Sequence, residues 1–574
     1  MFRVGRKVVA AALAATVMTG LLGAGVLRLV RAEEKTQPTA PTPAAGRIVF
    51  EDFTEKSCIR RLPLPKGIGG KTDPGAMKPG VVYWDSPFDV FCGELDGDGH
   101  MDILSADHHP SAKQQTPGGI WLGKGDGTFG PNVLERASIE GELSGIGGGY
   151  GGVLDIDGDG RMDFFCSEQG GVYLNGGTQG AGETRGIRFT SFKCGGWRGW
   201  IFGDFDRDGK LDAATGAGVY FGSGKGTHPA KGWKPSAQAA EAFKPWEDPL
   251  HSSIAADFRR SQAMDILCGQ CIWRYAWNQS KWEEKRAKAK QPRGLLYVND
   301  GKGNFTESAE PFGLAEMSST GPLVAADFNS DGYFDVFSVG LGNPDKPAKA
   351  RLHVNEGGKH FTSGDAREHG IDITSGASGI PFQYCCASAV DLDNDGLIDL
   401  IVGDGPAHRV RAFRNLGNFR FEEVEMPKSA AGTNEVRFAV ADFNEDGLAD
   451  LALNGGPNGV RVFLNRSETQ NGWLELTVRG TEGNPCGIGA LVEVFKPGRL
   501  GDTNAYVGMQ HVLAENHNHI PLTPHFGLGR QKSVDVRVTL PTGQVLEAKE
   551  LAAGTRALAD FTSNTVTAKQ EKGR

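Results

Sequence analysis

Six times the chain repeats one nine-residue pattern in which oxygen-bearing side chains alternate along a short loop. Positions 1, 3, 5 and 9 carry Asp, Glu or Asn, and position 6 is Gly in every copy. Recurrence of this pattern requires that the segments between the copies are repeated structural units. The side chains at positions 1, 3, 5 and 9 are Glu94, Asp96, Asp98 and Asp102; Asp155, Asp157, Asp159 and Asp163; Asp204, Asp206, Asp208 and Asp212; Asp327, Asn329, Asp331 and Asp335; Asp391, Asp393, Asp395 and Asp399; and Asp442, Asn444, Asp446 and Asp450.

The pattern predicts calcium binding. Calcium takes six to eight oxygen ligands at about 2.3–2.6 Å, and oxygens at alternate positions converge when the chain turns sharply. Gly at position 6 permits that turn because it adopts positive φ without steric cost. No sulfur ligand lies in these loops, which disfavours zinc and copper. A single Asp-Gly turn would be explained by solvation alone, whereas six copies predict about six calcium ions.

A helical calcium loop is the rival interpretation, and it requires a Glu at position 12. That position holds Ser105, Cys166, Thr215, Ser338, Val402 and Leu453. The residues after the loops are rich in β-branched and aromatic types, as in 397–403, and a Gly ends that run. The loops are therefore expected to connect strands.

Position 1 of the pattern falls at residues 94, 155, 204, 257, 327, 391 and 442. The copy at 257 has decayed: it keeps Asp257 and the closing Asp265 but has Arg259, Ser261 and Gln262 at positions 3, 5 and 6. Because Arg259 puts a cation where a ligand belongs, we expect no calcium in this copy.

Each repeat carries signals for about four strands, and seven such repeats predict an all-β, seven-bladed β-propeller. The seventh repeat lacks a fourth strand after 460–465. Residues 47–54 resemble the missing strand, so we expect them to pair with 460–465 and close the ring. Closure removes an exposed sheet edge.

The N-terminus is typical of an exported protein. Basic residues precede an apolar run, so 1–32 is predicted to be a signal peptide or an N-terminal anchor. A Pro-rich linker follows at 33–46. We expect a secreted, periplasmic or cell-surface protein that contacts a membrane only if the N-terminal segment is uncleaved. The nine Cys include Cys268 and Cys271, a spacing open to a local disulfide or a redox pair.

The loops, together with hairpins of the form Asn/Gly-x-Gly-x-Phe, resemble FG-GAP/VCBS repeats over 47–466. The tail, 471–562, resembles a UnbV/ASPIC domain through 471–476, 484–490, 525–529 and 534–543. Leu540 stands where that family usually has Trp. The order of modules resembles bacterial relatives of the cartilage acidic protein family. Independently, alternating β-rich runs with Gly and Pro turns predict a small C-terminal β-sandwich, and 563–574 is expected to be a disordered tail.

Four histidines of the tail, His511, His517, His519 and His525, leave open a transition-metal site. The alternative is a polar loop with His525 held by local hydrogen bonds, which we favour because no acid or Cys is clearly placed to complete the set.

No catalytic motif is present: the chain contains no Gly-x-Ser-x-Gly, His-Glu-x-x-His or P-loop sequence. Its formal charge of −9 and the absence of a basic patch argue against a nucleic-acid partner. We therefore expect an extracellular calcium-binding interaction or adhesion module for protein or glycan ligands rather than an enzyme. The alternatives are an extracellular hydrolase, lyase or redox enzyme with its site on one propeller face, and a purely structural surface protein, since propellers host unrelated functions.

Overall fold

The computed structural model describes residues 47–59, 87–107, 119–133, 138–143, 151–166, 170–180, 186–194, 199–215, 218–243, 252–269, 294–317, 321–340, 350–373, 384–404, 408–430, 436–454, 460–514 and 520–569. Residues 40–574 form one compact unit. The expected signal peptide and linker lie outside the described residues. In the described part of the chain, no helix has the length and apolar character needed to cross a membrane.

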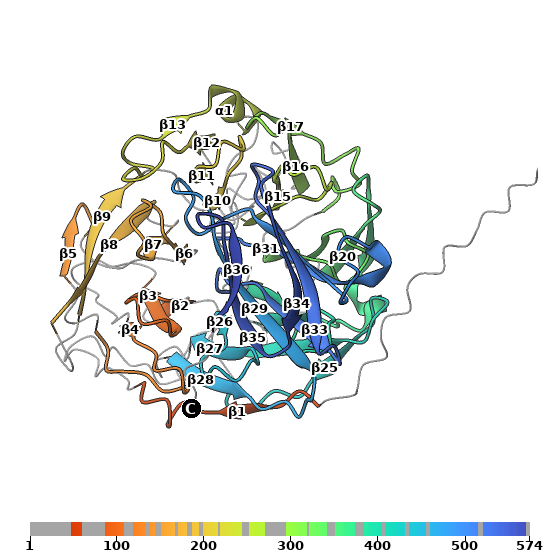
Figure 1. Ribbon diagram of the computed structural model, residues 1–574. Coiled ribbons are helices and arrows are strands. Elements are labelled where there is room, and N and C mark those ends of the chain that lie inside the picture. The colour runs from red at the N-terminus through yellow and green to blue at the C-terminus, as the bar shows by residue number, and fades with distance from the viewer. Residues whose placement is uncertain are drawn as a thin grey trace, which may run out of the picture. The chain divides into compact units, whose positions relative to one another are not determined.

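Seven small sheets follow one another within the described residues from 50 to 465, as the sequence predicts (Figure 1). Blade 1 contains β2 (Pro87–Gly93), β3 (Asp102–Asp107) and β4 (Gly119–Trp121); blade 2 contains β6 (Gly151–Leu154), β7 (Asp163–Cys166), β8 (Gly171–Gln179) and β9 (Gly186–Lys193), with β5 (Ser138–Gly141) parallel to β9; blade 3 contains β10 (Ile201–Gly203), β11 (Asp212–Thr215), β12 (Gly218–Phe221) and β13 (Lys234–Pro235).

The remaining blades each have four antiparallel strands. Blade 4 contains β14 (Ser252–Ala256), β15 (Asp265–Gly269), β16 (Gly294–Asn299) and β17 (Phe305–Glu307); blade 5 contains β18 (Leu323–Ala326), β19 (Asp335–Val339), β20 (Ala350–Asn355) and β21 (Phe361–Asp365); blade 6 contains β22 (Tyr384–Val390), β23 (Asp399–Asp404), β24 (Arg409–Asn415) and β25 (Phe421–Val424); blade 7 contains β26 (Phe438–Ala441), β27 (Asp450–Asn454), β28 (Val460–Asn465) and β1 (Phe50–Asp52). Short helices, α1 (Ala237–Phe243), η4 (Ala366–His369) and η6 (Thr503–Ala505), are confined to connections.

The N-terminal strand closes the ring, which confirms the expected pairing of 47–54 with 460–465. In blade 7, β1 runs antiparallel to β28, with Phe50 opposite Asn465 and Asp52 opposite Phe463. The pairing extends beyond the strand itself, because the Phe53 N–H donates to the Val462 carbonyl at 2.9 Å. Phe50, 6% exposed, packs in a core shared by blades 6 and 7.

Neighbouring blades are joined by the same two contacts repeated around the ring. In five blades a buried Asn of the third strand, which is the last residue of that strand except in blade 2, donates from Nδ2 to the position-2 carbonyl of the preceding blade, at 2.8–2.9 Å. These residues are Asn175, Asn299, Asn355, Asn415 and Asn465. A Phe of the fourth strand, or in blade 1 Phe129 from the segment after β4, meets the preceding blade's position-2 Phe edge to face. The pairs are Phe129–Phe443, Phe205–Phe305, Phe258–Phe361 and Phe328–Phe421.

The C-terminal region is a sandwich of two four-stranded sheets, as expected. One sheet contains β32 (His525–Gly529), β29 (Gly472–Arg479), β35 (Thr555–Asp560) and β36 (Thr565–Lys569), and the other contains β31 (Tyr506–His511), β30 (Leu491–Phe495), β33 (Ser533–Thr539) and β34 (Val545–Ala552). The expectation of a disordered tail over 563–574 is wrong for 565–569. Those residues pair with β35, and the half-buried Val566 packs against the sandwich core, so the polar composition conceals an edge strand.

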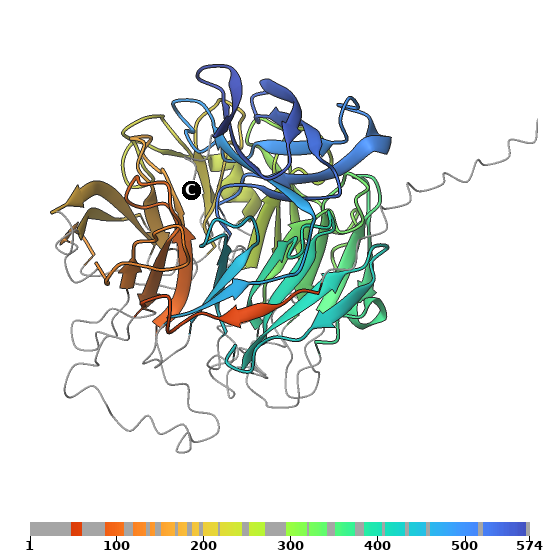
Figure 2. The same ribbon diagram turned by 60° about the horizontal axis from the view of Figure 1, so that its bottom comes forward.

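The sandwich lies on the blade face that carries the nine-residue loops (Figure 2). Its core is continuous with that of blades 2 and 3: Leu154 and Phe202 of the propeller belong to the same buried cluster as Val492 and Val536 of the sandwich. A backbone bridge between Phe202 and Ala514 joins the two parts. The propeller and sandwich are therefore packed as one body within 40–574, although the sequence presents them as successive modules.

If β1 closes the ring, Phe50→Ala should lower the free energy of unfolding by about 3–5 kcal/mol, the usual effect of removing a buried Phe. Chemical denaturation in calcium measures the change, with the exposed Glu55→Ala as control. A Phe50→Ala protein that unfolds at the wild-type denaturant concentration would contradict the closure.

Candidate metal centres

Each nine-residue loop connects the first strand of a blade to the second, and the second strand begins at position 9. The Gly at position 6 has φ between 83° and 92° in all six intact loops, which is the left-handed conformation the sequence requires. In five of them its N–H donates to the carboxylate at position 1, at 2.7–3.0 Å. Backbone and carboxylate thus fold the loop around a common centre.

The closing Asp at position 9 is fully buried and ties the loop to its blade. One of its oxygens accepts from the position-2 N–H, and the other accepts from an N–H at the end of the third strand. In blade 6, for example, Asp399 accepts from Leu392 at 2.9 Å and from Asn415 at 2.7 Å. The equivalent residues that make both bonds are Asp102, Asp163, Asp212, Asp335 and Asp450.

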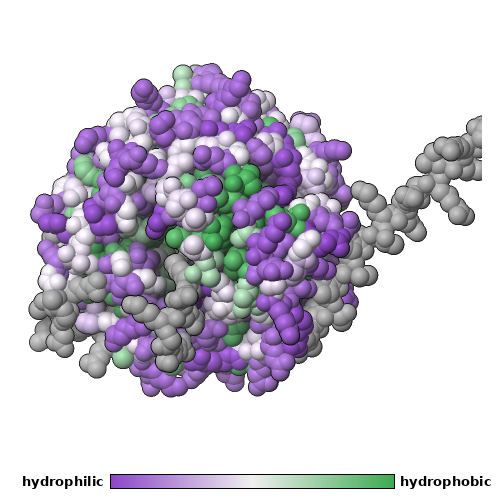
Figure 3. Space-filling model, in the orientation of Figure 1, coloured by the Kyte–Doolittle hydropathy of each residue, from purple (hydrophilic) through white to green (hydrophobic). Residues whose placement is uncertain are grey.

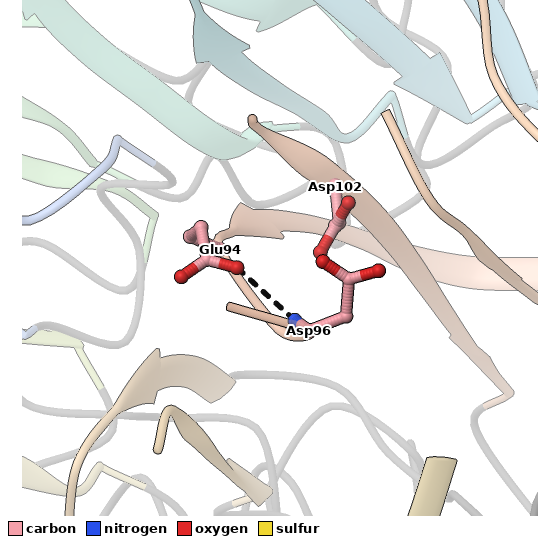
Figure 4. A group of neighbouring side chains, drawn as sticks. All are labelled: Glu94, Asp96 and Asp102. Atoms are coloured by element: carbon pink, nitrogen blue, oxygen red, sulfur yellow. Dashed lines mark hydrogen bonds between the residues drawn. The ribbon is translucent and has the colours of Figure 1, made fainter. Parts of the chain in front are cut away.

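Four loops bring oxygens from positions 1, 3 and 9 within 4.8 Å of one another, a geometry that could hold a metal ion. Figure 4 shows one of these groups, in which Glu94 also accepts from the Asp96 N–H at 3.1 Å. The groups are Glu94, Asp96 and Asp102; Asp155, Asp157 and Asp163; Asp204, Asp206 and Asp212; and Asp391, Asp393 and Asp399.

The other two intact loops have Asn at position 3, so they offer one carboxylate fewer. Asn329 donates to Asp331 at 3.0 Å, and Asn444 donates to Asp446 at 2.9 Å, which places the position-3 and position-5 side chains together. Their position-1 residues, Asp327 and Asp442, are buried like Asp155, Asp204 and Asp391 of the first group. An amide oxygen is also a calcium ligand, so the residues present are compatible with an ion here too.

Burial and mutual repulsion make these carboxylates poor anions when no cation is bound. Desolvation is the largest cause of raised pKa values here, and repulsion from neighbouring acids adds to it. The pKa of Asp155 rises to about 6, and those of Asp204 and Asp327 rise to about 7. Asp204 is 1% exposed, and its Oδ1 has no hydrogen-bond partner within the described residues. A divalent cation fits this arrangement, because it would neutralise the loop and satisfy the remaining oxygen.

The decayed loop of blade 4 carries its own cation. The Arg259 guanidinium binds both oxygens of Asp265, each at 2.9 Å, and also donates to the Asn299 carbonyl at 2.7 Å. Asp257 still accepts from the N–H groups of Ser261 and Gln262 at 2.7 and 2.6 Å. The loop therefore keeps its fold while an arginine provides the positive charge, in agreement with the sequence interpretation.

The two described histidines of the tail, His511 and His525, contact different parts of the propeller. His511 is buried, accepts from the Asp257 N–H at 3.2 Å and stacks on Phe334. His525 lies over the loop of blade 6, with Nε2 2.7 Å from Asn394 Oδ1 of the propeller and Nδ1 3.7 Å from Glu475 Oε1 on the neighbouring strand of the sandwich. His517 and His519 lie outside the described residues.

The cysteine pair and its insertion are only partly described. Cys268 is buried in β15, and burial raises the pKa of its thiol well above the ordinary value. Cys271 and the charged insertion 273–293 lie outside the described residues.

A cavity of about 770 Å³ separates the decayed loop from the outer face of the sheet β31–β30–β33–β34. Arg260 of the loop reaches across to Glu493 at 2.5 Å. Glu493 lies opposite Arg537, which lies opposite Glu547, so the sheet presents an alternating row of charges. Beside this row lie Leu491, Thr539 and Val545, directly opposite one another. The cavity could not be predicted from sequence patterns, because it forms only where the sandwich packs on the ring.

Comparison with protein families identifies the repeats. A family model described as an FG-GAP-like repeat matches residues 94–166, 155–215 and 391–453. The chain carries FG-GAP-like repeats. Each matched segment begins at position 1 of an intact loop and includes the following loop, so the match covers the same unit that the geometry defines.

Curated relatives are similar over part of their length. Cartilage acidic protein 1 of Xenopus tropicalis is 29% identical over 287 residues, which cover 47% of this chain and 40% of that protein. The human protein is 28% identical over 276 residues, covering 45% and 39%. The chain therefore spans about two fifths of the length of the curated relatives it matches.

Among solved structures, an Agrocybe aegerita lectin that recognises non-reducing terminal N-acetylglucosamine superposes with a TM-score of 0.36 and 16% identity, over 67% of this chain and 91% of that chain.

The role of Arg259 gives a prediction that does not depend on calcium. Arg259→Met leaves the buried Asp265 without its cation and should lower the free energy of unfolding by about 3–5 kcal/mol. Denaturation in calcium and in chelator measures the loss, which should be the same in both, since no ion belongs to this loop. A loss confined to calcium-loaded protein would mean that the fourth loop binds metal after all.

Proposed function

We propose that the protein is an exported, calcium-stabilised interaction module that binds a protein or glycan ligand. The observation that carries the calcium part is the gathering of three carboxylate oxygens within 4.8 Å in each of four loops. All-oxygen sites of this kind suit calcium rather than softer metals. A calcium-rich medium outside the cytosol would keep such loops filled, which agrees with the export signal expected at 1–32.

The ligand-binding part of the proposal rests on the cavity over blade 4. It is large enough for a small ligand or one arm of a larger one, and its walls combine charged pairs with apolar side chains. Val545 lies at the rim of the cavity and is 46% exposed, and no other large apolar side chain in the described residues is exposed. The face toward the viewer in Figure 3 carries an apolar patch among hydrophilic residues. Exposed apolar surface with a polar rim is typical of an interaction site.

Calcium should stabilise the folded chain through the intact loops. A ligand that binds only the folded state adds about 2.7 kcal/mol per site at a hundred times its Kd, so calcium should raise the melting temperature and chelator should lower it. Asp159 and Ser261 occupy position 5 of an intact and the decayed loop. Differential scanning calorimetry should find that Asp159→Ala reduces the calcium-dependent increase and that Ser261→Ala leaves it intact.

The calcium proposal fails if calcium and chelator give the same wild-type melting temperature. Equal losses of the calcium-dependent increase in Asp159→Ala and Ser261→Ala would instead remove the distinction between intact and decayed loops.

Ligand binding should depend on the cavity rim. Val545→Glu places a charge on the apolar row, and loss of one good apolar contact corresponds to about a tenfold loss of affinity. Immobilised glycans and cell-surface proteins of the source organism are the probes, and Thr567→Glu, exposed on β36 outside the cavity, is the control. Retention by wild type and Thr567→Glu but not by Val545→Glu supports the assignment. Undiminished retention by Val545→Glu excludes the cavity as the binding place.

A further inference from the structure

The loop of blade 6, residues 391–399, is called the sixth loop here, and it is more deeply buried than the other intact loops. All four of its carboxylates are buried: Asp391, Asp393 and Asp399 are 0% exposed, and Asp395 is 4% exposed. Each of the other five loops leaves at least one of the equivalent side chains half-buried or exposed. Of the four acid groups with suitable metal geometry, that of the sixth loop is the one in which every member is buried.

The C-terminal sandwich provides this cover by direct contact with the loop backbone. Asn471 Nδ2 donates to the Asp393 carbonyl at 3.0 Å, and the Gly529 N–H donates to the Asn394 carbonyl at 2.9 Å. The Asn394 side chain is held on both sides: its Oδ1 lies 2.7 Å from His525 Nε2, and its Nδ2 donates to the Gly447 carbonyl of the seventh loop at 2.8 Å.

Gly527 marks how closely the sandwich approaches. A Cβ at this position would lie 1.9 Å from Asp391 Oδ2 and 2.5 Å from Asn394 Cα. Neither neighbour is the flexible end of an exposed side chain, because both belong to the buried loop. The backbone of β32 therefore seals the sixth loop, and it does so only because residue 527 has no side chain.

The charge inside this sealed space is unbalanced. Arg414 lies 2.5 Å from Asp393 Oδ2 and 3.0 Å from Asp395 Oδ2. When all four carboxylates are ionised, one arginine leaves three negative charges without a partner, and each buried charge without compensation costs several kcal/mol. Asp393 Oδ1 is buried and has no hydrogen-bond partner among the described residues. This oxygen, together with Asp391 and Asp399, is where a cation would be bound.

We propose that the sixth loop holds an occluded calcium ion, sealed beneath the C-terminal sandwich, that exchanges only when the sandwich lifts from the ring. The inference rests on the proposed calcium binding and adds a division among the sites. Ions in the more open loops exchange with solvent directly, whereas the sixth ion is a structural part of the contact between sandwich and propeller. Removing it leaves net negative charge in that contact, so loss of the ion and release of the sandwich are linked.

Calcium release measured by rapid mixing with excess chelator tests the proposal. The calcium-loaded full chain should release its ions in two phases, with one ion per chain leaving at least about ten times more slowly than the others. Release of all ions in one phase overturns the occlusion while leaving calcium binding intact. Failure to bind any calcium before mixing is a different result, and it overturns the proposed function itself.

Variants assign the slow ion to the sixth loop. Asp393→Ala should remove the slow phase, whereas Asp206→Ala should reduce the fast amplitude. Asn471→Ala removes a hydrogen bond of the seal without touching a carboxylate, and it should speed the slow phase about tenfold, as expected when a group that orients metal ligands is removed. Gly527→Ala, whose Cβ would press on Asp391 Oδ2 and force β32 away from the loop, should speed the slow phase as well. Gly508→Ala is the matched control, because a Cβ there would meet only the Phe526 ring at 3.6 Å, an ordinary contact.

Melting in saturating calcium checks that each variant folds. If Gly527→Ala does not fold, Asn471→Ala alone tests the seal. A slow phase that persists in Asp393→Ala, or that Asn471→Ala leaves at the wild-type rate, contradicts the assignment.

Discussion

One buried carboxylate per blade holds the ring in register. The closing Asp accepts one backbone N–H from its own loop and another from the end of the third strand, so loop and blade cannot form separately. Hydrogen bonds to a charged group are worth about 1.5–3 kcal/mol each, and an unpaired buried donor would cost a similar amount. Asp265 of the decayed loop keeps the bond to the third strand, from the Asn299 N–H at 2.9 Å, although positions 3 and 5 have changed. The closing carboxylate stabilises the fold through these two hydrogen bonds, and its negative charge then requires a cation nearby.

Two solutions to that charge requirement occur in the same ring. In blade 4 an arginine of the loop binds the closing Asp directly. In the intact loops further carboxylates gather instead. Burial, together with their mutual repulsion, raises the pKa values of Asp155 and Asp204 and makes an external divalent cation the natural partner. The first solution is permanent and independent of the medium. Under the proposed calcium binding, the second makes the stability of the ring depend on dissolved calcium, a dependence suited to a protein that works where calcium is abundant.

The repeat pattern predicts the ring because it marks equivalent points along the chain: the seven blades and the pairing of β1 with β28 follow from spacing and from one missing strand. That Arg259 supplies a positive charge to the decayed loop can also be predicted from the sequence, since it stands at position 3, where the intact loops have a ligand. The partners of Asn175 and its equivalents are not, because they lie in the preceding blade and depend on how blades stack. The seating of the sandwich is likewise hidden, since contacts such as Asn394 with His525 join residues far apart in the chain. Polar composition concealed β36, which is ordered by pairing rather than by apolar content.

Anomalous X-ray diffraction from crystals grown in calcium would locate each ion independently of stability or exchange. We expect a calcium peak at each of the six intact loops and none between Asp257 and Asp265, where the Arg259 guanidinium should be found. A calcium peak in the fourth loop, or intact loops whose carboxylates are paired with protein donors and hold no ion, would contradict this expectation.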